Sequence, residues 1–199
     1  MEHELVDDRR EGGSDERRHA ELGLLQPRAP IFAIDDVVHF LLVEAAAVSS
    51  VIHFGGHAVI DIDTPDRSAL LLSTTDPESS TLTAPDIARL RLTRAPVVVL
   101  AACSTATGTA YQLEGATSLS RAFLLAGASS VVGSLWDIED EASEAFFVRF
   151  HRRLASGDAP AAALRAAQLE LLRTDDARLE APRAWAAFQL MGALSRPSE

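Results

Sequence analysis

The feature that most constrains the fold of this chain is a run of six apolar residues, Val97–Ala102, which ends in a stretch of small residues. Three β-branched residues open the run, and Pro96 stands just before it, where a strand tolerates a residue without an N–H group. A short apolar run with these boundaries predicts a strand buried on both faces. Such a strand requires helices on both sides of its sheet, which favours an α/β fold.

Other segments extend this pattern along the chain. Strands are predicted at residues 51–54, 69–73, 129–136 and 185–192, and helices at residues 37–46, 83–90, 116–126, 139–155 and 160–172. Thr83 is the expected N-cap of one helix, with Pro85 near its first position, and Gly127 is the expected end of the next helix. Strands that alternate with long helical crossovers predict a three-layer α/β sandwich around a parallel-rich sheet.

The 199 residues suit one domain with a hydrophobic core. Residues 1–30 are rich in Asp, Glu, Arg and Gly and predict a disordered charged arm, residues 31–194 the folded domain, and residues 195–199 a tail. The N-terminus lacks the apolar segment of a secretory signal, and no apolar run approaches the roughly 20 residues of a membrane span. A single cysteine also suits a reducing compartment. We therefore expect a cytoplasmic protein without membrane contact.

Missing residue types exclude several kinds of chemistry. The net charge of −11 opposes binding to nucleic acid, because neutralising phosphates requires clustered cations. All 18 basic residues are arginines, so a Schiff-base lysine, a P-loop lysine and a Ser-Lys dyad are excluded. The absence of asparagine excludes a Cys-His-Asn triad. One cysteine and scattered histidines predict no metal site, and no cofactor is expected.

The only cysteine, Cys103, directly follows the apolar run, and His57 follows another predicted strand after two glycines. We expect both residues in loops at strand ends, where an α/β sheet presents its chemistry. An ordinary thiol has a pKa of about 8.5, and a neighbouring imidazolium lowers it to roughly 3.5–7.5. The two residues are therefore a candidate nucleophile and base. Backbone N–H groups near Gly56, Ala58 and Cys103 are candidate donors to an oxyanion.

Several motifs occur in a fixed order between residues 34 and 192. They are Val51–His57, Ser68–Leu72, Leu82–Ile87, Val97–Thr105, Ser120–Ala128, Val131–Trp136 and Trp185–Phe188. Together they resemble the CHAT domain of the caspase-like peptidases. The resemblance implies a caspase-hemoglobinase fold and a thiol endopeptidase dyad, with His57 as the base and Cys103 as the nucleophile. Their separation also resembles that of caspases, whose histidine lies roughly 50 residues upstream of the cysteine.

The chain departs from the pattern of this family in three places. Ala58 stands where the family usually has glycine, and Asp137 stands where proline often follows the tryptophan. If position 58 requires a positive φ, alanine there is strained by roughly 1–2 kcal/mol. The family region usually begins further upstream with another strand and helix. We therefore expect the sheet to lack part of its N-terminal edge, which leaves strand backbone for a partner to cover.

Simpler interpretations compete for the same residues. A lone buried cysteine such as Cys103 is more often a small apolar residue than a nucleophile. His53 is a competing base, but its place inside an apolar strand favours a structural hydrogen bond. His151 follows Phe150 on a predicted helix and is expected to be partly exposed.

The acidic segment around Asp137 and Asp140 has two interpretations. The simpler one is a favourable acidic first turn of the following helix. The functional one is the wall of a specificity pocket that selects Arg or Lys before the scissile bond. An arginine-lined pocket would instead suit an acidic residue, and the sequence does not decide between these.

The leading hypothesis is a CHAT-type cysteine endopeptidase that cleaves a protein or peptide substrate without a cofactor. The alternative is an inactive or partial caspase-like interaction module. CHAT domains are often attached to helical repeats, so the resemblance also implies a helical-repeat sensor or activator, which here would act in trans. A further alternative is that the chain is a fragment of a longer gene product.

Overall fold

The computed structural model describes residues 31–34, 49–61, 63–72, 80–104 and 112–193. The predicted arm, the predicted tail and the helix expected at residues 37–46 lie outside these residues. Among the described residues, no helix is long and apolar enough to cross a membrane.

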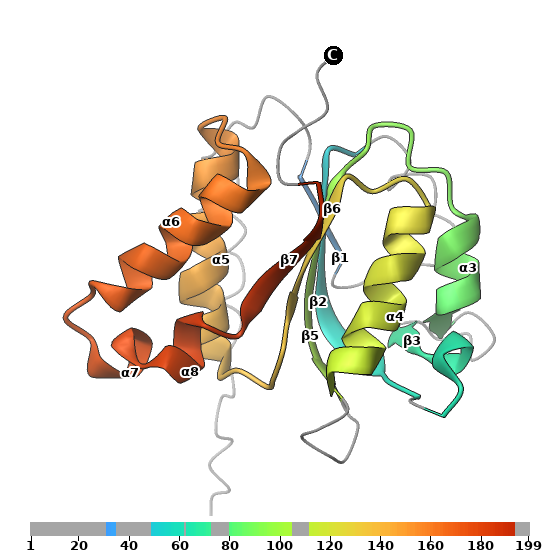
Figure 1. Cartoon of the computed structure of the whole chain (residues 1–199), viewed down its shortest axis with the longest axis horizontal. Coiled ribbons are helices and arrows are strands. Elements are labelled where there is room, and N and C mark those ends of the chain that lie inside the picture. Colours follow the sequence, from blue (N-terminus) through green and yellow to red (C-terminus); the bar gives the residue numbers. More distant parts are fainter. Residues whose placement is uncertain (1–30, 35–48, 62, 73–79, 105–111, 194–199) are drawn as a thin grey trace, which may run out of the picture.

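A mixed sheet of seven described strands forms the centre of the molecule (Figure 1). Its order is β4-β3-β2-β5-β6-β7, and β1 pairs with the first half of β2. The pairs that join β1, β2, β5 and β6 are parallel, whereas β3, β4 and β7 run antiparallel to their neighbours. The strands are β1 (Ile31–Ile34), β2 (Val51–Val59), β3 (Ala69–Leu71), β4 (Thr81–Thr83), β5 (Val97–Ser104), β6 (Ser130–Ser134) and β7 (Phe188–Gly192).

Helices cover both faces of this sheet (Figure 1), which confirms the predicted three-layer α/β architecture. The pair α3 and α4 lies on one face, and the pair α5 and α6 lies on the other. The short helices α7 and α8 contact α5 and α6. The helices are α3 (Ala84–Arg89), α4 (Gln112–Leu125), α5 (Asp140–Ala155), α6 (Pro160–Leu172), α7 (Ala177–Glu180) and α8 (Pro182–Trp185), with one 3-10 turn, η1 (Pro65–Arg67).

The central strand β5 shows why its sequence is apolar without alternation. Val98 and Leu100 belong to the core beneath α3 and α4, and Val97 and Val99 belong to the core beneath α5 and α6. Successive side chains of a strand point to opposite faces, so a strand with helices on both sides is apolar throughout. This continuous burial fixes β5 at the middle of the sheet.

Two predicted helix boundaries are confirmed. Thr83 is the N-cap of α3, and its side-chain oxygen accepts a hydrogen bond from the Asp86 N–H at 3.4 Å. Gly127 follows α4 with a φ of +107°, and a Cβ there would lie 3.0 Å from the Leu92 carbonyl oxygen. Both the backbone conformation and the close approach therefore require glycine at the end of α4.

Two strands are longer than predicted. β2 continues through the glycines and His57 to Val59, and β5 includes Cys103. The expected loops at these positions are therefore wrong. The reason is the long parallel ladder between the two strands, which pairs Val51 with Val97 and continues to Ala58 and Ser104. Ladder hydrogen bonds on neighbouring strands override the low strand propensity of adjacent glycines.

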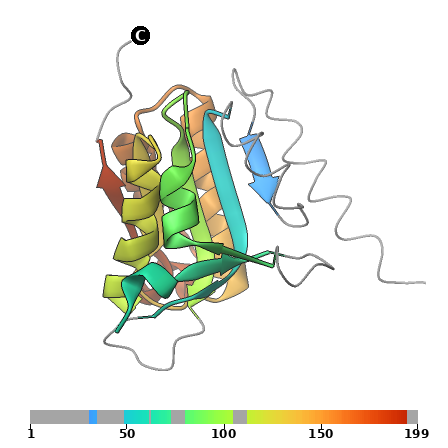
Figure 2. The same ribbon diagram turned by 90° about the vertical axis from the view of Figure 1, so that its right-hand side faces the viewer.

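The N-terminal edge of the sheet carries strands on both halves of β2. Its first half pairs with β1, and its second half pairs with the hairpin β3–β4 (Figure 2). The strand β1 was not predicted from the sequence. It begins at Ile31, the first residue of the domain expected from the sequence.

Candidate active site

The parallel register of β2 and β5 places His57 beside Cys103. The ladder pairs Gly55 with Ala101, Gly56 with Ala102 and His57 with Cys103. Neighbouring strands lie about 4.8 Å apart, so two backbones far apart in sequence become adjacent near the carboxyl ends of two central strands. The structure therefore brings together the backbone positions of the predicted base and nucleophile, within strands rather than in loops. The His57 side chain is exposed to solvent.

Ala58 occupies an ordinary strand position. It pairs with Leu70 on one side and with Ser104 on the other, and its side chain is 3% exposed. Among the described residues, Ala95 is the one non-glycine residue with a positive φ. Position 58 therefore does not require the left-handed conformation, and alanine causes no backbone strain there.

Gly56 lies at a gap in the strand pairing of β2. Pairing with β1 ends at Phe54, and pairing with β3 begins at His57. A Cβ on Gly56 would lie 3.0 Å from Cζ of Phe54. A residue larger than glycine would therefore crowd the Phe54 ring at this position. Among the described residues, the gap leaves the backbone at Gly55 and Gly56 paired with β5 on one edge and without a strand partner on the opposite edge.

The other histidine of β2 has a structural role. Nδ1 of His53 lies 2.7 Å from Nε2 of His151 on α5, and the Phe147 ring packs edge-on against His53 at a centroid distance of 5.0 Å. The structural hydrogen bond predicted for His53 is therefore confirmed. The exposure expected for His151 is wrong, because α5 packs on β2 and leaves this side chain 3% exposed.

Burial keeps both rings of this pair neutral at pH 7. Desolvation, with a smaller contribution from the neighbouring ring, lowers the pKa of His53 to about 3. Desolvation also lowers the pKa of His151 to about 4. Nδ1 of His151 has no hydrogen-bond partner among the described residues. The spacing of Phe147, His151 and Leu154 along the buried face of α5 was the sequence signal for this burial.

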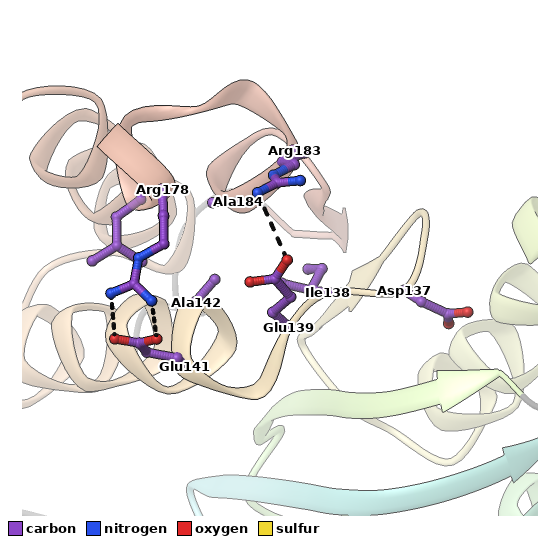
Figure 3. Close-up of a pocket in the computed structure, with 9 residues that line it drawn as sticks. Asp137, Ile138, Glu139, Glu141, Ala142, Arg178, Arg183 and Ala184 are labelled. Atoms are coloured by element: carbon purple, nitrogen blue, oxygen red, sulfur yellow. Dashed lines mark hydrogen bonds and ion pairs between the residues drawn. The ribbon is translucent and has the colours of Figure 1, made fainter. Parts of the chain in front are cut away.

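A pocket of about 180 Å³ lies between the β6–α5 connection and the helices α7 and α8 (Figure 3). Asp137 lines it, whereas Asp140, the first residue of α5, is not among its lining residues. The carboxylate of Asp137 points away from the neighbouring ion pairs (Figure 3). The pocket is lined by Asp137, Ile138, Glu139, Glu141, Ala142, Arg178, Leu179, Arg183 and Ala184.

Two arginines at this pocket were not predicted from the sequence. Arg178 donates hydrogen bonds of 3.0 and 3.1 Å to the two carboxylate oxygens of Glu141. Nη2 of Arg183 lies 3.7 Å from the carboxylate of Glu139. No local pattern indicates these pairs, because α7 and α8 follow the acidic segment only after two long helices.

The elements that line the pocket, namely the start of α5 and the helices α7 and α8, lie at the same end of the molecule as the carboxyl ends of β5 and β6 (Figure 1). β6 runs parallel to β5, and their ladder ends at the pair Leu100–Gly133. The chain then leaves the sheet through Leu135, whose N–H donates to the carbonyl oxygen of Ala187 at 2.9 Å. Among the described residues, no three side chains of His, Cys, Asp or Glu lie close enough together to hold a metal ion.

Comparison with solved structures shows the fold. The crystal structure of the Arg-specific cysteine proteinase gingipain R is similar to this chain with a TM-score of 0.54 at 12% sequence identity. The similarity covers 80% of this chain and 36% of that chain. The chain therefore has an α/β fold similar to the caspase-hemoglobinase fold of gingipain, as the motif resemblance implied.

Comparison of sequences shows the family. Tetratricopeptide repeat protein 28 is 36% identical over 120 residues in Mus musculus and over 121 residues in Homo sapiens, which is 59% of this chain in each case. The chain spans about 5% of the length of these relatives. The family model of the CHAT domain matches residues 14–193, a match that begins upstream of the motifs quoted above. The chain belongs to the CHAT domain family.

Proposed function

We propose that this chain is a cysteine endopeptidase in which Cys103 is the nucleophile and His57 is the base. The observation that carries this proposal is the register pair His57–Cys103 near the carboxyl ends of β2 and β5. Residues paired across parallel strands lie on one face of a sheet, close enough for a thiol and an imidazole to meet. Membership of the CHAT family and a fold shared with a cysteine proteinase support the same assignment.

The proposed reaction is acyl transfer through a thioester. The Cys103 thiolate attacks the scissile carbonyl carbon, the C–N bond breaks, and protonated His57 gives its proton to the leaving amine. Neutral His57 then takes a proton from water, whose oxygen attacks the thioester, and the C–S bond breaks to release the acid and restore the Cys103 thiolate beside protonated His57. Backbone N–H groups around Gly56 and Cys103 are the proposed oxyanion donors. Ala58 is the weaker candidate because strands flank it on both sides.

For the substrate we propose a peptide with Arg or Lys before the scissile bond. Asp137 lines a pocket at the end of the sheet where β5 terminates, and its carboxylate is turned away from the ion pairs of Glu139 and Glu141 (Figure 3). Asp140 is not part of this pocket, so Asp137 is the better candidate of the two predicted residues. The solved structure with a similar fold is described as Arg-specific, which is consistent with an acidic pocket.

The second candidate function is a caspase-like interaction module that works with a helical-repeat partner. The observation that favours it is the relationship to tetratricopeptide repeat protein 28, of which this chain spans only 5%. A helical-repeat sensor or activator acting in trans would serve either candidate, since repeat arrays provide extended concave binding surfaces.

A peptide-library cleavage assay separates these functions. The unmodified chain is expected to cleave peptides, with Arg or Lys enriched before the cut, and Cys103→Ala is expected to cleave none. Cleavage retained by Cys103→Ala contradicts the proposed nucleophile. Absence of cleavage by the unmodified chain, with and without an added helical-repeat partner, favours the interaction module.

A further inference from the structure

The strands β5 and β6 separate at the level of the candidate site. Their parallel ladder ends at the pair Leu100–Gly133, whereas β5 stays paired with β2 as far as Ser104. Among the described residues, residues 101–104 of β5 therefore have no strand partner on the β6 side. An unpaired strand edge readily accepts another strand, so this edge stays open only if the end of β6 is held away from it.

The end of β6 stays with β7 instead. The ladder between these two strands includes the pair Ser134–Phe188, and the N–H of Leu135 donates to the carbonyl oxygen of Ala187 at 2.9 Å. The indole Nε1 of Trp136 adds a hydrogen bond of 3.0 Å to the carbonyl oxygen of Arg183. Residues 134–136 are therefore tied to the segment 183–188, which joins α8 to β7.

Gln168 of α6 anchors this segment. Its side-chain Nε2 donates hydrogen bonds of 3.3 Å to the carbonyl oxygen of Trp185 and of 3.0 Å to that of Phe188. In an antiparallel pair, the N–H and C=O groups of alternate residues point toward the partner strand. Because the Ala187 carbonyl oxygen faces β6, that of Phe188 faces away from it, and Gln168 binds it there. One side chain therefore connects the segment 183–188 to α6 at two points.

Closure of β6 onto β5 would cover the candidate nucleophile. If the ladder continued in its present register, Trp136 would pair with Cys103, three residues beyond the pair Leu100–Gly133. Residues paired across parallel strands share one face of the sheet. Trp136 would therefore lie beside Cys103 on the face that carries His57. A bulky side chain at that place would stand between the thiol and a substrate.

We propose that Gln168 is a positioning residue, which anchors the segment 183–188 to α6 and thereby keeps β6 from closing over Cys103. Closure would not break the hydrogen bond between Leu135 and Ala187, because that bond lies on the β7 side of β6. It would instead require the segment to move together with β6, and Gln168 opposes this movement. The inference rests on the proposed function for its consequence, which is access of a substrate to the thiol. Closure itself involves no catalysis, so it can be measured apart from cleavage.

A disulfide trap measures the closed arrangement. Trp136→Cys places a second thiol at the position that would pair with Cys103, and paired positions on neighbouring strands lie within the Cα separation that a disulfide spans. Copper phenanthroline is the oxidant, and intact mass after alkylation of the remaining thiols gives the rate. Because only the closed arrangement reacts, this rate is proportional to its population even when that population is small. If Trp136→Cys does not fold, Ala101→Cys with Ser134→Cys in the Cys103→Ala background traps the same register.

Matched variants in the trap background isolate the role of Gln168. Gln168→Met keeps the size of the side chain without its donors and is expected to speed disulfide formation about two- to tenfold, the factor that corresponds to one ordinary hydrogen bond. Gln189→Met, the same substitution on β7 next to Phe188, is expected to leave the rate unchanged. Ile87→Val is also expected to leave it unchanged. Ile87 is fully buried beneath the opposite face of the sheet, so this variant weakens the fold without touching the anchor. Rates are compared among variants whose urea midpoints show a folded chain.

Two results would overturn the inference. One is the absence of the disulfide from every folded trap variant, and the other is a rate that Gln168→Met raises no more than Ile87→Val does. In either case, peptide cleavage that Cys103→Ala abolishes leaves the proposed peptidase standing. The expected rates in a chain that cleaves no peptide, alone or with a helical-repeat partner, would overturn the peptidase and keep the positioning role of Gln168.

Discussion

The strand β2 carries two histidines whose surroundings differ sharply. His53 and His57 lie four residues apart and so share one face of the sheet. His53 packs beneath α5 against Phe147 and His151, whereas His57 is exposed near the carboxyl end of the strand. The two histidines share their strand and their face of the sheet. What separates the structural histidine from the candidate base is therefore whether α5 covers the side chain.

The helix α5 creates this difference. The chain leaves the sheet after β6, and α5 begins at Asp140 and runs back over the strands. Its second half therefore covers the first half of β2. Phe147 and His151 therefore meet His53, and the carboxyl end of β2 remains open to solvent. Chemistry requires contact with a substrate, and this fold leaves only one of the two histidines accessible for it.

The largest expected effect is the loss of activity in His57→Ala. General acid–base catalysis contributes about 10²- to 10⁴-fold, so kcat/KM for peptide cleavage is expected to fall by that factor. The free energy of unfolding is expected to change by no more than about 0.5 kcal/mol, because the side chain is exposed. Steady-state cleavage together with urea unfolding measures both, and activity close to that of the unmodified chain would remove His57 from the dyad.

Acid is expected to unfold the protein through the other histidine pair. The folded pKa values of about 3 and 4 lie below the ordinary value of 6.5, so the unfolded chain binds more protons between roughly pH 4 and 6.5. The stability contribution of His53 and His151 is complete above about pH 6.5 and declines below it, by up to about 2.7 kcal/mol per pH unit for both groups.

Urea midpoints at pH 7, 6 and 5 measure this decline. The double variant His53→Leu/His151→Leu is the control, and its midpoint is expected to fall much less over the same interval. An equal decline in both proteins would show that other groups cause the acid sensitivity.

Removal of one ring from the buried pair is expected to destabilise the fold at constant pH. His151→Ala leaves a cavity beneath α5 and removes the hydrogen-bond partner of His53, which together cost about 2–4 kcal/mol. His151→Leu is expected to cost less, because it refills the space and removes the unpartnered Nδ1. Thermal unfolding of both variants tests this order, and a smaller loss in His151→Ala than in His151→Leu contradicts the packing account.

The smallest expected effect concerns Gly56, which lies between the two histidines. A Cβ there would be 3.0 Å from the Phe54 ring, so Gly56→Ala is expected to cost about 1 kcal/mol as that ring shifts. Gly133→Ala on β6 is the matched control, because nothing lies within 4 Å of its added Cβ. Equal stability losses in the two variants would show that the contact with Phe54 is unimportant.

The sequence was informative where local pattern and long-range packing agree. The apolar run of β5 and the capped start of α3 were predicted because burial on two faces and a Thr83 cap leave direct signatures. The motif order indicated the family and, through it, the pairing of His57 with Cys103.

The remaining features depend on partners that are distant in sequence. Gly55 and Gly56 indicated a loop, but ladder pairing with β5 holds them in a strand. The burial of His151 depends on where α5 lies across the sheet. The contacts of Arg178 and Arg183 with the acidic segment depend on the return of α7 and α8 to the start of α5.

The pH dependence of Cys103 alkylation tests the central claim most directly. Cys103 is the only cysteine, so the iodoacetamide adduct measured by intact mass reports on this thiol alone. If His57 activates Cys103, the alkylation rate rises with a midpoint well below the ordinary thiol pKa of about 8.5, and His57→Ala moves that midpoint back toward 8.5. The same profile in both proteins, with a midpoint near 8.5, would contradict the dyad.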